Sequence, residues 1–277
     1  MGNNLFSDDR VSRNNQDDEG EIKYLLQKDE ISSIKSIFNA IYLPQQKLDN
    51  SNREKNIATL LGGNKSDLFS EICTYWLDAH IGTLDSFENF VVECTRISSK
   101  ETIKKLLAMI SEAPLIEVGK HKVVFFRVLL ELCGCPGQNS EKVANKIVEF
   151  YRWLQKTHPS EDHEEFKAFF NFINKYLPFA SKIFESHISE ACMPSVLNSP
   201  SYSRFWPPSL SHHSSIVDHE TLILLAMHNR HLQATWTRLY STEIDGMSFN
   251  RVEHHILGYD VCYSLSIFVC NEPSVHL

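Results

Sequence analysis

The sequence predicts a mainly α-helical protein whose C-terminal end begins a second, mixed α+β unit. Apolar residues recur at helical spacing from about residue 21 to residue 192, which indicates amphipathic helices. Near the C-terminus a short aromatic run ends in an Asp-Gly turn, which is typical of strand rather than helix. The chain has 277 residues, of which 42% are hydrophobic, so it can form a substantial core.

Residues 1–20 are polar and rich in Asn and Asp, and they are predicted to be a disordered leader. Gly2 follows the initiator Met and is a candidate lipidation site, although Phe6 stands where the myristoylation pattern has Ser or Thr. The sequence is compatible with a lipidated N-terminus and with an unmodified leader. One acyl chain binds membrane only with about 10⁴ M⁻¹, so peripheral membrane contact would need a second anchor or a protein partner.

Residues 21–192 are predicted to form a helical domain. Ser140 is the expected N-cap of one of its helices, and Pro178 is expected to close another. The expected buried faces are Phe87, Phe90, Val91 and Cys94; Ile103, Leu106, Leu107 and Ile110; Val143, Ile147, Phe150, Tyr151 and Leu154; and Phe166, Phe169, Phe170, Ile173 and Leu177.

The run VVFFRVLLELC, residues 123–133, is apolar nearly all round and fits a central helix or a buried strand; its helical neighbours favour a helix. Its last residue, Cys133, is separated from Cys135 by one residue, whereas zinc sites usually have about two to four. Metal or redox use of this pair is an alternative to buried thiols, which we expect. Seven cysteines without framework spacing indicate a reducing compartment.

Residues 67–91 have the helix–loop–helix spacing of an EF-hand. Gly82, Leu84 and Glu88 fall at positions six, eight and twelve of the loop. Positions one, three and five are Leu77, Ala79 and Ile81, which lack the oxygen ligands that calcium requires. We therefore predict an EF-hand-like helix pair that binds no metal, against the alternative that the spacing is coincidental.

Residues 193–218 are rich in Pro, Ser and His and are predicted to be a linker, in which Phe205 and Trp206 either dock on a neighbouring surface or stay solvated. A helix is expected over 220–232. After it, the spacing of Trp236, Leu239 and Tyr240 predicts a strand that ends at Ser241-Thr242. Gly246 marks a turn, and Ser248 is the expected N-cap of a helix with Phe249 on its apolar face.

The order Trp, Leu-Tyr-Ser, acidic residue, Gly and Ser-Phe resembles the opening motif of the TLDc domain. The matching residues are Trp236, Leu239, Tyr240, Ser241, Gly246, Ser248 and Phe249. The upstream helix LLAMHNRHLQATW resembles the entry helix of that domain. The layout of the helical region is most similar to the mTOR-associated, eak-7-homologue branch of the family.

The resemblance implies a non-enzymatic interaction or regulatory protein with an α+β TLDc fold built on a β-sandwich. It implies protein partners among V-ATPase subunits and mTOR pathway components, and a cytoplasmic location that is peripheral at the lysosomal membrane. The seven matching residues are carried over as a structural signature without a catalytic role. Cofactors are not expected.

The resemblance stops early, because residues 219–277 are too short for a complete TLDc domain. The tail VCYSLSIFVC alternates in pattern and could add one strand, but one strand leaves a sandwich with unpaired edges. We therefore expect a truncated start of the domain, in a truncated isoform or a non-functional gene product. The other alternative is a calcium-sensor-type adaptor.

Composition and motifs disfavour two further classes of function. The net charge is −8 and the basic residues form no block, which argues against nucleic-acid binding. Hydrolase, zinc-protease, phosphate-loop and dinucleotide motifs do not occur, so catalysis is not expected.

Overall fold

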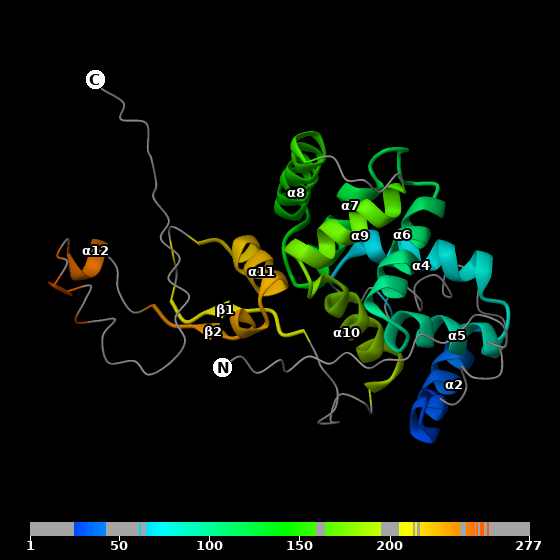
Figure 1. Ribbon diagram of the computed structural model, residues 1–277. Coiled ribbons are helices and arrows are strands. Elements are labelled where there is room, and N and C mark those ends of the chain that lie inside the picture. Colours follow the sequence, from blue (N-terminus) through cyan, green and yellow to red (C-terminus); the bar gives the residue numbers. More distant parts are fainter. Residues whose placement is uncertain are drawn as a thin grey trace, which may run out of the picture.

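The computed structural model describes residues 25–42, 61, 65–158, 164–194, 205–212, 214, 217–238, 242–246, 248, 250–251 and 254. Within these residues the protein is mainly helical, and its strands are the two-residue β1 (Ser209–Leu210) and β2 (Thr235–Trp236) (Figure 1). The prediction of a mainly helical protein is therefore confirmed at that level.

The helices follow one another with short connections. They are α2 (Lys28–Tyr42), α4 (Asp67–His80), α5 (Leu84–Thr95), α6 (Ser99–Glu112), α7 (His121–Leu132), α8 (Gly137–Thr157), α9 (Glu165–Tyr176), α10 (Ala180–Cys192), α11 (His219–His228), the 3-10 helix η4 (Arg230–Leu232) and α12 (Thr242–Asp245).

Local sequence explains where several of these helices begin. Ser66 caps α4 by accepting the backbone N–H of Phe69 at 3.0 Å, and Asp218 caps α11 by accepting that of Thr221 at 2.8 Å. Thr83 and Ser86 form a capping box at the start of α5. Each cap satisfies a backbone donor that has no partner within the helix.

The start of α8 corrects a prediction. Pro136, not Ser140, is the N-cap residue, and Ser140 lies fully buried in the first turn. The expected helix over residues 123–133 is confirmed as α7. It ends in a Schellman motif, in which Gly134 has φ of 91° and the N–H of Cys135 donates to the carbonyl of Leu130 at 3.1 Å.

Helix α10 occupies the middle of the helical body and packs against α2, α5, α6 and α7. Its residues from Ile183 to Ser189 are all buried, so the helix is surrounded on every side. Phe184 of α10 meets Phe69 of α4 edge to face, with ring centroids 5.7 Å apart. The ion pair between Glu30 and Arg96 joins α2 to α5.

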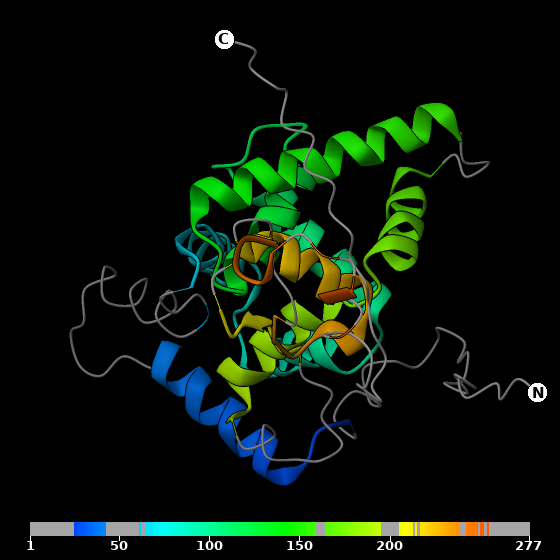
Figure 2. The same cartoon turned by 90° about the vertical axis from the view of Figure 1, so that its left-hand side faces the viewer.

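A second layer of aromatic packing joins α7, α8 and α9. Phe169 contacts Phe125 and Tyr151 with ring centroids 5.6 and 5.5 Å apart, both edge to face. The expected aromatic stripe of α9 is only partly right, because Phe166 and Phe170 are half-buried and Phe172 is buried in their place. Helix α8 runs along one edge of the body, with α9 beside its C-terminal half (Figure 2).

Candidate functional site

Helix α11 fixes the start of the segment that resembles TLDc. Leu222, Ile223, Ala226 and Met227 are buried, and the last three belong to the same hydrophobic core as the preceding helices. The N–H of Phe179 donates to the carbonyl of Met227 at 2.9 Å, which ties the end of α11 to the start of α10. Helix α11 is therefore packed on the helical body.

The chain beyond α11 is less buried than α11, and a short strand pair holds its first residues. Strand β2 pairs in parallel with β1 over two residues, Ser209 with Thr235 and Leu210 with Trp236. The indole N–H of Trp236 donates to the carbonyl of Leu232 at 3.0 Å, and the ring is half-buried. Beyond the strand, α12 lies farther from the body than α11 (Figure 1), and its Ile244 is 66% exposed.

The Asp-Gly turn is present, because Gly246 has φ of 77°. This left-handed conformation favours glycine, and a Cβ added there would lie 3.3 Å from the guanidinium of Arg251. The N–H of Arg251 donates to the carbonyl of Ser248 at 3.1 Å, and Asn250 and Arg251 are helical. Leu239, Tyr240, Ser241 and Phe249 of the signature lie outside the described residues, as does the candidate lipidation site Gly2.

The predicted helix–loop–helix corresponds to α4 and α5, which only Ile81, Gly82 and Thr83 connect. Loop positions one and three, Leu77 and Ala79, lie inside α4, and Leu77 is fully buried. At the other end Leu84 begins α5, and Glu88 is buried within it. The EF-hand-like character of this pair remains a prediction.

The Cys133–Cys135 pair lies at the end of α7, where both residues are buried and neither thiol is in a disulfide. Burial raises the pKa of Cys133 well above its usual range. Burial, and to a smaller extent the carboxylates of Glu220, Asp218 and Glu131, raise the pKa of Cys135 to about 12. Thiols that stay protonated are weak nucleophiles and weak metal ligands. The described residues contain no group of three or more potential metal ligands.

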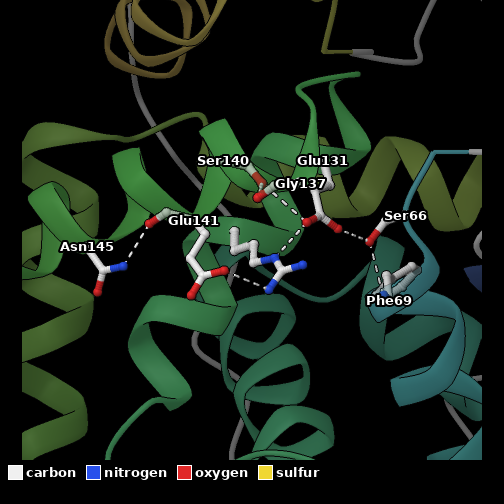
Figure 3. A network of polar contacts seen from close by, with 8 residues as sticks. Ser66, Phe69, Glu131, Gly137, Ser140, Glu141 and Asn145 are labelled. Carbon is white, nitrogen blue, oxygen red and sulfur yellow. Dashed lines mark hydrogen bonds and ion pairs between the residues drawn. The ribbon is translucent and has the colours of Figure 1, made fainter.

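A buried polar network centred on Glu131 joins α4, α7 and α8 (Figure 3). Glu131 is 4% exposed and accepts the hydroxyl of Ser66 at 2.5 Å and that of Ser140 at 3.2 Å. The Nε of Arg127, one turn earlier in α7, donates to the same carboxylate at 2.7 Å. An Nη1 hydrogen bond of 3.2 Å then links Arg127 to Glu141.

A cavity of about 380 Å³ opens beside this network, lined by Lys65, Arg127, Pro136 and neighbouring residues. Its two basic side chains are already engaged, since Lys65 lies 3.6 Å from Glu190 and Arg127 is bound to Glu131. The network therefore holds α4, α7 and α8 together and has a structural role. The sequence analysis missed this network; the Ser66-Asp67 helix start and the i, i+4 spacing of Arg127 and Glu131 are the signals that could have indicated parts of it.

None of the helices in the described ranges combines the length and the apolar character that crossing a bilayer requires.

No protein-family model, curated protein or solved structure matches the chain.

Proposed function

We propose that this protein is a non-enzymatic interaction protein of the TLDc type, in which a helical scaffold presents its C-terminal segment to protein partners. One observation supports the proposal most. Helix α11 is built into the scaffold core, whereas the segment after it pairs through a two-residue strand and exposes the apolar Ile244. An extended segment of a partner can add to an exposed strand edge through main-chain hydrogen bonds, and an exposed apolar side chain can pack against it.

The expected partners follow from the resemblance of residues 236–249 to the TLDc opening motif. They are V-ATPase subunits and mTOR pathway components at the lysosomal membrane, with lipidated Gly2 as the peripheral anchor. The buried, protonated thiols and the internally satisfied Glu131 network support a scaffold role.

The test is a pull-down of purified V-ATPase subunits and mTOR components by the full chain and by the variant Ile244→Asp. The exposed side chain should tolerate Asp without loss of folding, and recovery of a partner should fall at least about tenfold, since a buried interface charge costs more than 1.4 kcal/mol.

Val118→Asp is the matched control. Val118 lies between α6 and α7 and is 96% exposed, so it carries the same change from apolar to acidic at a distant surface. Equal recovery by the parent chain and Ile244→Asp, or no recovery of either class of partner, would reject the proposed function.

A further inference from the structure

The C-terminal half of α8 carries a pair of aromatic side chains that remain partly exposed to solvent. Phe150 is 43% exposed and Trp153 is 54% exposed, and their rings stack with centroids 6.0 Å apart at an interplanar angle of 17°. Phe150 also contacts Tyr176 of α9, with ring centroids 5.6 Å apart. Large aromatic side chains are the residues that most often anchor protein interfaces.

A cavity of about 240 Å³ adjoins this pair, between the end of α8 and the exposed side of α9. Its lining includes Leu154, Phe172 and Tyr176, together with the exposed Lys175. Phe172 and Tyr176 also contact Phe150, so the cavity and the aromatic pair form one continuous surface. We call it the α8–α9 face: Phe150, Trp153, Leu154, Phe172, Lys175 and Tyr176.

Two exposed basic side chains border this face: Lys156, one turn after Trp153 on α8, and Lys175 of α9, which lines the cavity. Lys156 and Lys175 form no ion pair with any other residue that the structure describes. Their charges are therefore available to a partner, and Lys175 lies 5.2 Å from the ring centroid of Tyr176.

We propose that the α8–α9 face binds an acidic amphipathic helix of a partner protein. An apolar side chain of that helix enters the cavity, a second packs on the Phe150–Trp153 pair, and carboxylates on its flanks face Lys156 and Lys175. Helices bind grooves in this way through apolar anchors at i, i+3, i+4 and i+7. A lipid surface fits less well, because it offers no side chain to fill the cavity.

This surface is separate from the C-terminal segment, so the inference does not depend on the proposed function. Its test uses two labelled synthetic peptides of about 18 residues, which is five helical turns. Both carry the same Leu and Phe stripe; one has Glu on its flanks and the other has Lys. Fluorescence anisotropy measures their binding to the full chain, and circular dichroism checks that each variant is folded.

We expect the acidic peptide to bind at least about tenfold more tightly than the basic one, with an affinity that falls as salt is added. Trp153→Glu should weaken acidic-peptide binding at least about tenfold. Trp206→Glu is the matched control, because Trp206 is 56% exposed and lies outside this face, and it should bind as the parent chain does. The double variant K156E/K175E should prefer the basic peptide.

Vesicles of phosphatidylserine and phosphatidylcholine form a second arm, read by co-sedimentation. Vesicle binding that Trp153→Glu abolishes, without acidic-peptide binding, would assign the face to membranes and overturn the proposal. Failure of both peptides to bind, equal affinity for the two, or an unchanged Trp153→Glu variant would also overturn it.

Discussion

At the scale of single residues, Glu131 shows how a carboxylate is retained in a helical core. It occupies an almost wholly apolar helix, yet two serine hydroxyls and one guanidinium donate to it. A buried carboxylate is tolerated when its oxygens are satisfied in this manner. Because the donors come from α4, α7 and α8, the same carboxylate joins three helices.

Replacing Glu131 by Ala should lower the free energy of unfolding by about 2–3 kcal/mol, because the Nε of Arg127 and the buried hydroxyl of Ser66 lose their acceptor, whereas the Ser140 hydroxyl keeps the carbonyl of Gly137. Urea denaturation followed by circular dichroism measures the change. Glu141→Ala is the control, since Glu141 is exposed and binds only the outer edge of Arg127, and its effect should stay below about 1 kcal/mol. Equal losses of unfolding free energy in the two variants would contradict the structural role of the Glu131 network.

A second buried polar residue, His187 of α10, has one satisfied ring nitrogen. Its Nε2 donates to the carbonyl of Leu61, while its Nδ1 is buried without a hydrogen-bond partner among the described residues. Burial lowers the pKa of His187 and outweighs the opposing effect of the Leu61 hydrogen bond; Lys65 and Glu190 are the charged groups nearby.

Because this pKa is lower in the folded state than in the unfolded chain, the unfolded chain binds the proton first as the pH falls. The contribution of His187 to stability is therefore present above about pH 6.5 and is lost below it. His187→Gln should reduce the drop in unfolding free energy between about pH 7.5 and about pH 5. The exposed His231→Gln serves as control, and an unaltered pH dependence in His187→Gln would refute this assignment.

At the scale of elements, the α4–α5 pair is a tight corner between two amphipathic helices. Ser66 and the Thr83–Ser86 capping box fix where the two helices begin, and three residues connect them. Phe87 and Phe90 of α5 are buried, and Phe90 meets Trp76 of α4 with ring centroids 5.1 Å apart. Apolar packing therefore accounts for the corner.

We expect no calcium binding at this pair. Leu77, Ala79 and Ile81 supply no oxygen ligand at the positions where an EF-hand loop needs one, and Leu77 is part of the core. Isothermal titration of the full chain with calcium should show no heat of site binding. A dissociation constant of about 10 µM or tighter, the range of calcium sensors, would contradict both the loop assignment and the scaffold reading.

At the scale of the whole molecule, one hydrophobic core extends from Leu26 to Met227. It includes α11, which the sequence placed in a separate C-terminal unit. Phe205, from the predicted linker, is also in this core, and its N–H donates to Ser186 at 2.9 Å. Phe205 therefore docks on a neighbouring surface, whereas the Trp206 side chain beside it is 56% exposed.

A charge at the end of this core should therefore destabilise the entire helical body. Met227→Asp is expected to lower the free energy of unfolding by about 3 kcal/mol, because an unpaired carboxylate replaces a buried apolar side chain. Ile244→Asp introduces the same charge beyond α11 and should change it by less than about 0.5 kcal/mol. Similar values for the two variants, in denaturant melts, would mean that α11 is not part of the cooperative unit.

Sequence patterns determined the elements whose cause is local. The apolar run of residues 123–133 became α7, the chain turns at Gly246, and Pro178 follows the end of α9, each because backbone conformation and helical periodicity depend on near neighbours. The sequence could not place Ser140, which the pattern made an N-cap and which instead bonds Glu131 inside the core.

Tertiary structure decided which polar groups are satisfied and which apolar groups remain exposed. Ser66 and Glu131 are 65 residues apart, and Phe150 meets Tyr176 only because α9 folds back along α8. Periodicity marked Phe150 as a core residue, yet its ring is 43% exposed although it contacts Phe172 and Tyr176 of α9. Helical spacing in the sequence specifies which side chains share one face of a helix. Whether that face is buried depends on elements that are distant in the chain.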